Sequence, residues 1–231
     1  MQRHHSAHRV SVRYLLSVFH KQIIAEEQAG FRAGRSTTEQ IFDLRILCEK
    51  YLQHQQDLCH VFVDFKKAFD RVWHAALWAT MKKYNISANL IRVIKSLYGK
   101  ATSALLLNSS IGYWYRTTVG VRQRCLLSPT LLNIFLERIM TDALEDHEGT
   151  VSTVGKTITN LPFADDIDGF AREEEELANL VERLDKASTA YGMKISAEKT
   201  KLMTNNTSGI NTEIKVNGLR LETVTSFKYL A

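Results

Sequence analysis

The stretch Phe163-Ala164-Asp165-Asp166-Ile167-Asp168-Gly169-Phe170 places adjacent carboxylates between short apolar runs that are typical of buried strands. Burying unpaired carboxylates is costly, so such a pair at the tip of a core strand normally has cations to neutralise it. Hard ions such as Mg²⁺ bind through one or two carboxylates together with substrate phosphates. A tight turn with solvated acids is the alternative, and two adjacent aspartates alone would favour it.

The composition limits the class of protein. With 231 residues, 45% of them hydrophobic, and only two prolines and eleven glycines, the chain fits one globular domain, with or without a smaller appendage. No apolar run approaches the ~18 residues of a membrane span, and the apolar part of the start is too short for a signal peptide. Cys48, Cys59 and Cys125 are odd in number and lack zinc or redox spacing. We therefore expect an intracellular protein, neither secreted nor in a membrane.

The net charge of +5 is unevenly distributed. Residues 60 to 130 hold eleven Lys and Arg but only two acids, whereas residues 131 to 231 hold eleven basic and seventeen acidic residues. A basic middle section predicts a surface that binds a polyanion. Ordinary solvated lysines are the alternative, and charge alone does not decide between them.

Local signals divide the chain into elements. Ser36 and Glu39 form a capping box before an amphipathic helix with Ile41, Leu44, Leu47, Cys48, Tyr51 and Leu52 on one face. The run from 58 to 65 predicts a buried strand, and the residues from Asp64 to Asp70 open a helix that continues through Met81. Further expectations are a helix capped by Ser87 and closed by Gly99, a hairpin over 102–119, a helix with Ser128 as N-cap, a hairpin over 151–163, a helix from the acidic run 173–176 to Gly192, and a hairpin at Asn217-Gly218.

The first 27 residues carry little information, and His4, His5 and His8 fit a polar tip better than a metal site. The segment Gln28–Glu39 has two glycines and two arginines directly before a helix, which predicts a turn that contacts phosphate.

Six blocks taken together resemble a known family: 28–37, 63–70, 120–129, 163–166, 192–201 and 227–230. In this order they resemble the reverse transcriptase domain of a non-LTR (LINE-type) retrotransposon, truncated and partly degenerate. The resemblance runs from about residue 28 to the last residue. It implies an α+β fold, a right-hand polymerase palm whose antiparallel sheet has flanking helices, with partial fingers and no thumb. The implied division is a degenerate lead over 1–27, partial fingers over 28–57, and a palm over 58–231 with a fingers-side insertion at about 75–118.

The activity implied by the resemblance is RNA-directed DNA polymerisation, in which a primer 3′-OH attacks a dNTP with the help of two Mg²⁺ ions, or Mn²⁺. Asp64, Asp165 and Asp166 fall on the family's catalytic metal ligands. They can meet only if the strand ending at Asp64 neighbours the strand of the pair. The implied partners are an RNA template, a DNA primer, dNTPs and, for an intact relative, a ribonucleoprotein with the element's RNA, in the nucleus or cytoplasm.

The resemblance also implies roles for residues around the acids. Phe69 falls where an aromatic ring excludes a ribose 2′-OH, although a core phenylalanine is the alternative. Lys199 falls on a lysine near the triphosphate that can donate a proton to pyrophosphate, with Lys201 as the other assignment. Three further residues are expected near the template or nucleotide, namely Gln123, Arg32 and Arg35. Asp70 matches a family position, but a helix cap is the preferred role.

The chain departs from the family pattern at several positions. Arg124 stands where the family usually has glycine and is expected to forbid a positive φ, and Leu126 replaces a proline. Phe163 replaces a commoner tyrosine, and the fingers block that grips the triphosphate is missing upstream of Gln28. An inert remnant and a non-catalytic nucleic-acid-binding module are therefore the alternatives. An RNA-templated RNA polymerase or a group II intron maturase is disfavoured by Phe69.

Overall fold

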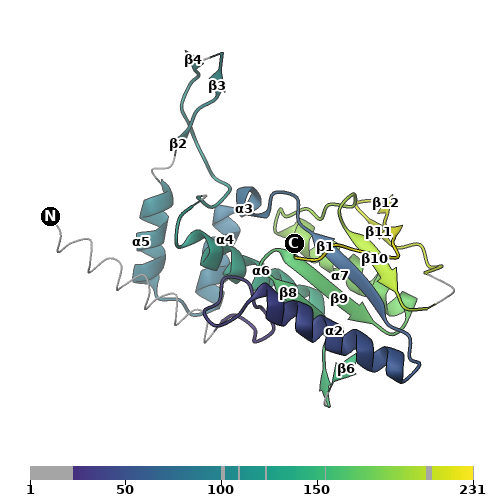
Figure 1. The fold of residues 1–231 in the computed structure, drawn as a ribbon. Coiled ribbons are helices and arrows are strands. Elements are labelled where there is room, and N and C mark those ends of the chain that lie inside the picture. Colours follow the sequence, from purple (N-terminus) through teal and green to yellow (C-terminus); the bar gives the residue numbers. More distant parts are fainter. Residues whose placement is uncertain are drawn as a thin grey trace.

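The computed structural model describes residues 23–99, 102–108, 110–122, 124–153, 155–206 and 210–230. Its centre is a five-stranded sheet in the order β13-β10-β1-β9-β8 (Figure 1). The strands are β1 (Cys59–Asp64), β8 (Asn160–Phe163), β9 (Asp166–Ala171), β10 (Lys201–Thr204) and β13 (Glu222–Thr223). All neighbours pair antiparallel except β10 and β13, which pair in parallel. The predicted α+β architecture is confirmed, with one parallel pair at its edge.

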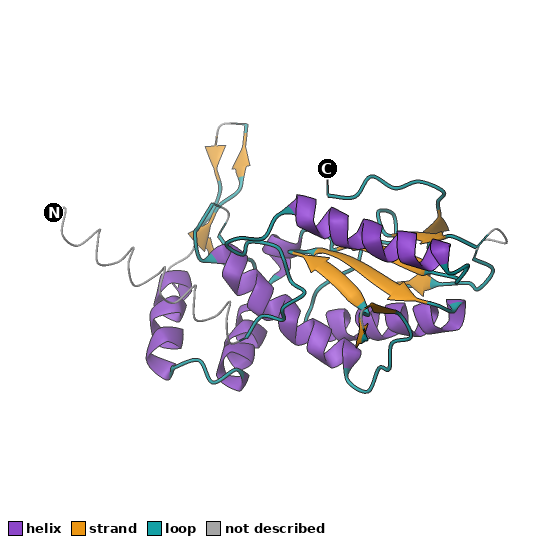
Figure 2. Cartoon of the chain, turned by 60° about the horizontal axis from the view of Figure 1, so that its bottom comes forward, coloured by secondary structure: helices purple, strands orange, loops and turns teal. Residues whose placement is uncertain are grey.

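Helices cover both faces of this sheet (Figure 2). On one face, Val61, Val63 and Ile167 belong to the main core with α6 (Ser128–Leu144) and α7 (Glu174–Ala190). On the other face, α2 (Thr37–Gln53) packs on β8, and its Leu47 and Tyr51 form a smaller core with Phe170. Because both faces are covered, β1 is buried up to its terminal acid, and His60 is the one polar residue before that acid.

The capping box of α2 is present as predicted, since the Glu39 amide donates to the Ser36 hydroxyl over 3.2 Å and the Ser36 amide donates to the Glu39 carboxylate over 3.1 Å. The predicted apolar face of this helix is partly wrong, because Ile41 and Leu52 are exposed. A buried Gln40 replaces them on the packed face, where its side chain donates to the carbonyl of Pro162.

The helix predicted from Asp64–Asp70 through Met81 is broken in two, α3 (Ala68–Arg71) and α4 (His74–Lys83). Backbone pairing with a later segment causes the break. The amide of Gly120 donates to the carbonyl of Val72 over 2.9 Å, and the amide of His74 donates to Thr118 over 3.2 Å. The N-cap position of α4 is Trp73, so the expectation that Asp70 caps it is wrong.

The next segment forms an arm. Helix α5 (Ala88–Gly99) begins after Ser87, whose hydroxyl accepts from the Leu90 amide as predicted. The predicted hairpin follows as two short ladders, β2 (Thr102–Ser103) with β5 (Tyr115–Arg116) and β3 (Leu106–Leu107) with β4 (Ser110–Ile111). This arm, residues 102–108 and 110–116, projects away from the body of the molecule (Figure 1).

Two more expectations need correction. Helix α6 begins at Ser128, but its N-cap is Leu127, because the Ser128 hydroxyl donates to the carbonyl of Arg122 over 2.6 Å instead of capping. The hairpin predicted over 151–163 is shorter, since β6 (Ser152–Thr153) pairs with β7 (Lys156–Thr157) while β8 joins the central sheet.

The last predicted hairpin is confirmed as β11 (Lys215–Val216) and β12 (Leu219–Arg220), joined by Asn217 and Gly218 at positive φ. Within the described part of the chain, no helix combines the length and apolarity needed to cross a bilayer.

Candidate active site

The three predicted carboxylates lie together at one end of the central strands. Asp64 is the last residue of β1 and Asp166 the first of β9, and the two are register partners. Phe163 pairs with Asp166, so Ala164 and Asp165 form a two-residue turn between β8 and β9. Ala164 has a φ of 59°, as such hairpin turns require. The expectation that the Asp64 strand neighbours the strand of the pair is confirmed.

The three carboxylates lie close to one another, and Lys199 is the cation that offsets their repulsion. Burial together with repulsion from Asp165 and Asp64 raises the pKa of Asp166 to about 6. Burial and the charge of Asp64 also raise the pKa of Asp165. Lys199 Nζ lies 3.3 Å from Asp64 Oδ2, while Asp64 Oδ1 is buried without a hydrogen-bond partner. The negative charge of the site is therefore only partly compensated, which favours the binding of cations.

The donor set fits a hard divalent ion, because all three groups offer carboxylate oxygens. Over the described ranges, no three His, Cys, Asp or Glu side chains are already gathered around a common point as metal ligands would be. The carboxylates would have to turn toward one another to share an ion.

We expect Asp166→Asn to raise the melting temperature at pH 8 in EDTA. The pKa of Asp166 is about 6 in the fold, above its ordinary value of 3.8. Ionisation of this group therefore costs the fold stability at high pH, and stability returns as the pH falls from 6 toward 3.8. Melting curves at pH 8 and pH 4 check this, since the gain should vanish at pH 4. An equal gain at both pH values would contradict it.

The predicted phosphate-contacting turn at Gln28-Ala29-Gly30 has another structural role here. The Gln28 side chain is buried, and its Oε1 accepts from the amide of Ala164 over 2.7 Å while its Nε2 donates to the Ala164 carbonyl over 3.1 Å. The Ala29 amide donates to Pro162 over 3.0 Å, and Asn133 donates to the Gly30 carbonyl over 2.8 Å. We call these contacts the Gln28 clamp. It holds the backbone of the turn that carries Asp165.

Gly30 is required by this close approach, because a Cβ there would lie 2.1 Å from the Ala164 nitrogen. We expect Gly30→Ala to displace the turn and reduce any polymerase rate about 100-fold, the effect of a ~1 Å misplacement. Gly99→Ala is the matched control, since its Cβ would meet nothing within 4 Å. Primer-extension rates compare the two variants. Equal rates would show that the turn tolerates the shift.

A cavity of about 470 Å³ opens over the carboxylates. Asp64, Asp166 and Lys199 line one side, and the segment Phe227–Leu230 lines the other. Phe227 is anchored there, since its ring stacks on Phe62 with centroids 4.4 Å apart. The sixth sequence block thus lies across the sheet beside the acids.

Beneath this cavity lies a buried ion pair that the sequence did not reveal. His60 Nδ1 is 3.4 Å from Asp168 Oδ1, and both side chains are almost completely buried. Burial lowers the pKa of His60, but the Asp168 carboxylate outweighs it and raises the pKa to about 9. Burial likewise raises the pKa of Asp168, against the opposing effect of His60. Asp168 faces the same side of β9 as Asp166, so the pair belongs to the support of the site.

The other predicted site residues are placed as follows. Phe69 is a half-buried residue of α3, and its ring meets that of Phe31 edge to face with centroids 6.2 Å apart. Lys201 donates to Glu222 over 2.6 Å, so Lys199, not Lys201, reaches Asp64. Gln123 lies outside the described residues.

The arginines are engaged in the loop itself. Arg32 donates to the carbonyls of Ala25 and Gln28, and Arg35 pairs with Glu26 at 2.6 Å. Arg124 has a φ of 63°, so the expectation that it forbids a positive φ is wrong. It takes the conformation that glycine would take, at a cost of ~1–2 kcal/mol.

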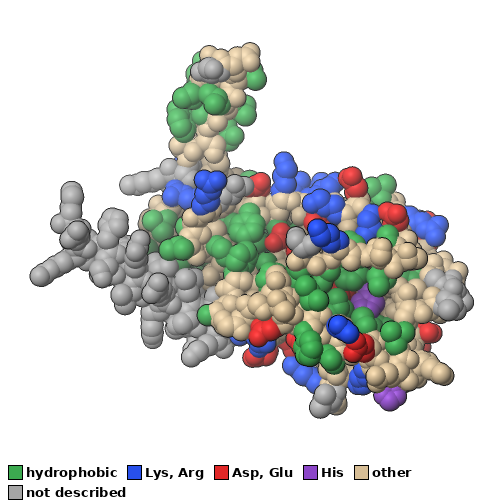
Figure 3. All heavy atoms as spheres, in the orientation of Figure 1, with side chains coloured by type: hydrophobic (Ala, Val, Ile, Leu, Met, Phe, Trp, Pro, Cys, Tyr) green, Lys and Arg blue, Asp and Glu red, His purple; other side chains and the backbone are tan. Residues whose placement is uncertain are grey.

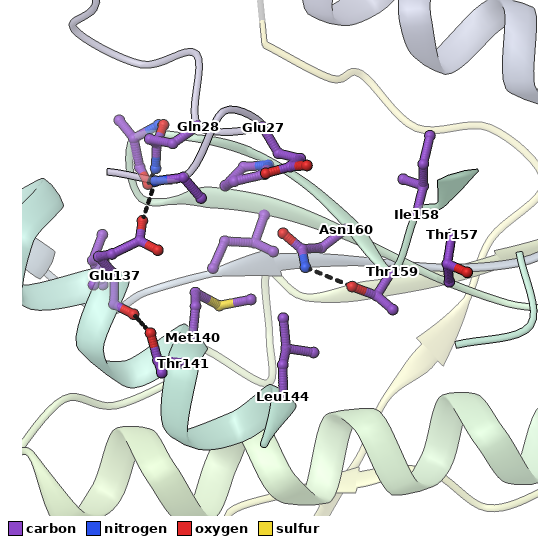
Figure 4. A pocket seen from close by; sticks show the side chains of 15 residues that line it. Glu27, Gln28, Glu137, Met140, Thr141, Leu144, Thr157, Ile158, Thr159 and Asn160 are labelled. Atoms are coloured by element: carbon purple, nitrogen blue, oxygen red, sulfur yellow. Dashed lines mark hydrogen bonds between the residues drawn. The ribbon is translucent and has the colours of Figure 1, made fainter. Parts of the chain in front are cut away.

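A second cavity, of about 300 Å³, lies between α6, β8 and the segment before Gln28 (Figure 4). Glu137 projects into it and accepts from the Ala25 amide over 3.0 Å, and burial raises the pKa of this glutamate. None of the three clustered carboxylates lines this cavity. The acids that do line it are Glu27 and Glu137.

Comparison with known proteins agrees with this arrangement. A model of the family "Reverse transcriptase (RNA-dependent DNA polymerase)" matches residues 2–231. The chain is 26% identical over 214 residues to the RNA-directed DNA polymerase from mobile element jockey of Drosophila melanogaster, covering 90% of this chain and 23% of that protein. It is 28% identical over 194 residues to a Pol polyprotein from the retrotransposable element R2 of Nasonia vitripennis, covering 84% and 19%. The chain thus spans about a fifth of the length of these relatives.

A solved structure shows the same fold. Telomerase from Candida tropicalis, in complex with a fragment of telomeric RNA, matches with a TM-score of 0.66 and 17% identity over 90% of this chain and 35% of that one. This likeness confirms the polymerase palm fold. The match over nearly the whole chain shows that this protein belongs to the reverse transcriptase (RNA-dependent DNA polymerase) family, as the resemblance of its six blocks to non-LTR retrotransposon enzymes predicted.

Proposed function

We propose that this chain is the polymerase domain of a retrotransposon protein and copies RNA into DNA by adding dNTPs to a primer 3′-OH. The observation that carries the proposal is the meeting of Asp64 and Asp166 on paired strands, with Asp165 in the adjoining turn and Lys199 against Asp64. Family membership and the RNA in the telomerase complex support RNA as the template.

The carboxylates supply what a pair of Mg²⁺ ions needs. All three are hard oxygen donors, and one buried oxygen of Asp64 has no hydrogen-bond partner. Burial and the neighbouring carboxylates raise the pKa values of Asp165 and Asp166. Bound Mg²⁺ would stabilise charge on the attacking and leaving oxygens of the displacement. Asp64, Asp165 and Asp166 are the ligands that we propose.

The chain's own groups then position the substrates and move protons. Lys199, whose Nζ lies 3.3 Å from Asp64 Oδ2, is the residue that we propose donates a proton to the pyrophosphate leaving group. The Gln28 clamp holds the turn that carries Asp165, so the position of the Asp165 carboxylate does not depend on the turn alone. We propose that residues 28–57 act as fingers, that the palm begins at 58, and that Arg32, Arg35 and Gln123 serve the template or nucleotide.

Phe69 is the proposed barrier to ribonucleotides, and its half-buried ring at the start of α3 fits that place. We expect Phe69→Val to raise the ratio of rNTP to dNTP incorporation without improving dNTP use, because it removes a steric clash. Single-nucleotide incorporation assays with matched rNTP and dNTP check this. An unchanged ratio would make Phe69 a core residue that only supports Phe31.

The proposal is tested by primer extension with the purified 231-residue chain, an RNA template, a DNA primer, dNTPs and Mg²⁺. Extension that requires both Mg²⁺ and the RNA template is the expected result. The strained Arg124 predicts a slow rate, since positioning near the nucleotide dominates this chemistry. No extension at any enzyme concentration, with Mg²⁺ or Mn²⁺, would identify an inert remnant instead.

A further inference from the structure

A recess of about 440 Å³ lies at the foot of the arm, away from the carboxylates. Helices α4 and α5 and strand β5 form its walls, and none of its lining residues lines the cavity over Asp64. Its size is that of ordinary small-ligand pockets. The polymerase chemistry described above makes no use of it.

The walls of the recess are aromatic. Trp73, Trp78, Tyr98 and His74 line it, with the Trp78 and Tyr98 rings 6.0 Å apart and inclined by 64°. Trp73 is 45% exposed, which is unusual for so large an apolar side chain in a packed domain. The His74 ring is fixed by a 2.7 Å hydrogen bond to the Gly120 carbonyl. Tyr98 and His74 are buried, so the exposed Trp73 and the half-buried Trp78 are the rings on which a flat base can stack.

The rim of the recess is basic. Lys95 and Arg116 line it and are exposed, and no acid lines it. The sequence from Arg71 to Leu136 contains nine Lys and Arg and no Asp or Glu. Basic side chains gather at the foot of the arm (Figure 3). This charge selects against cationic or neutral partners and favours a polyanion.

Aromatic faces combined with a basic rim are what unpaired nucleic acid requires, since bases stack on the rings while phosphates meet the cations. A duplex hides its base faces and would gain only the charge contacts. The neighbouring arm extends the same chemistry, with Tyr113 and Trp114 exposed by 99% and 66% and with Arg116 at its base.

We propose that this recess binds single-stranded RNA through Trp73, Trp78, Lys95 and Arg116, as a second contact outside the catalytic cavity. The choice of RNA over other polyanions rests on the proposed function, in which RNA is the strand that is copied. The recess holds an unpaired part of that strand beside the palm.

The chain has a built-in reporter for this site, because its three tryptophans are Trp73, Trp78 and Trp114, two in the recess and one on the arm. Titrating the protein with an oligouridylate of about twelve nucleotides in EDTA should quench their fluorescence. The quenching should persist in Trp114→Phe. If Trp114→Phe abolishes it, the arm binds the RNA and the recess does not.

Anisotropy of labelled RNA then measures affinity in the variants. We expect Trp73→Ala to weaken binding about tenfold, the loss of one stacked base, and Trp73→Phe to restore most of it. Neutralising both Lys95 and Arg116 to Gln should reduce the slope of log K against log salt by about 1.4. Lys186→Gln, exposed on α7, is the matched charge control and should leave the slope unchanged.

The outcomes separate this inference from the proposed function. RNA binding that is sensitive to Trp73 but occurs in a chain without primer extension supports the recess and not the polymerase. Primer extension together with Trp73→Ala binding equal to that of the unmodified chain overturns the recess alone. Duplex RNA that binds as tightly as the single strand, or binding insensitive to salt, also overturns it.

Discussion

Asp64→Asn should abolish Mg²⁺-dependent primer extension while leaving the fold intact. The substitution keeps the shape of the side chain but removes one of the three charges that we propose hold the ions. Metal ions at such sites contribute several kcal/mol of charge stabilisation, so we expect a loss of about 10³-fold or more in rate. Primer extension measures the rate, and electron paramagnetic resonance of Mn²⁺ measures metal affinity independently of activity.

Asp43→Asn is the control for this change, since Asp43 is an exposed carboxylate on α2. It should leave both the rate and Mn²⁺ affinity unaltered. Unchanged Mn²⁺ affinity in Asp64→Asn would remove the metal role from this carboxylate, whatever the rate does.

The second large effect concerns the buried pair of His60 and Asp168. We expect His60→Ala to lower the free energy of unfolding by about 3–5 kcal/mol at pH 6, because Asp168 would be left buried without a counter-charge. The pKa of His60 is about 9 in the fold against an ordinary 6.5. The contribution of the raised His60 pKa is therefore complete below pH 6.5 and is lost as the pH rises through 9. Urea denaturation at pH 6 and pH 9.5 measures both the loss and its decline.

The double variant His60→Leu with Asp168→Leu separates charge from packing. Replacing both partners with apolar side chains of similar size removes the desolvation cost, so it should be close to neutral or stabilising. A double variant as unstable as His60→Ala would mean that shape, and not the unpaired carboxylate, explains the loss.

The elements that the sequence predicts correctly are those whose signals are local. The capping box of Ser36 and Glu39, the strand ending at Asp64 and the hairpin at Asn217 all follow from residues within a few positions of each other. The meeting of Asp64 with the adjacent acids also follows, because family order constrains which strands are neighbours.

The errors arise where distant segments compete with local preference. The helix stops at Val72 because the carbonyl of Val72 accepts a hydrogen bond from the Gly120 amide. Ser128 does not cap its helix because its hydroxyl donates to the Arg122 carbonyl. The His60 pair and the Gln28 clamp were missed for a related reason. His60 and Gln28 are polar residues whose partners, Asp168 and Ala164, are far away in the sequence. Only the assembled sheet brings each residue next to its partner.

The Gln28 clamp has a consequence for synthesis of the protein. It joins residues that are 136 positions apart, so most of the chain between them must exist before the clamp can close. A ribosome adding 5–20 residues per second needs roughly 7–27 s to cover that interval. During this time Gln28 lacks its hydrogen-bond partner, the backbone of Ala164, and Asp64 lacks its register partner, Asp166. The catalytic end of the sheet is thus a late product of folding, and every prematurely terminated chain ending before Ala164 is released without a site.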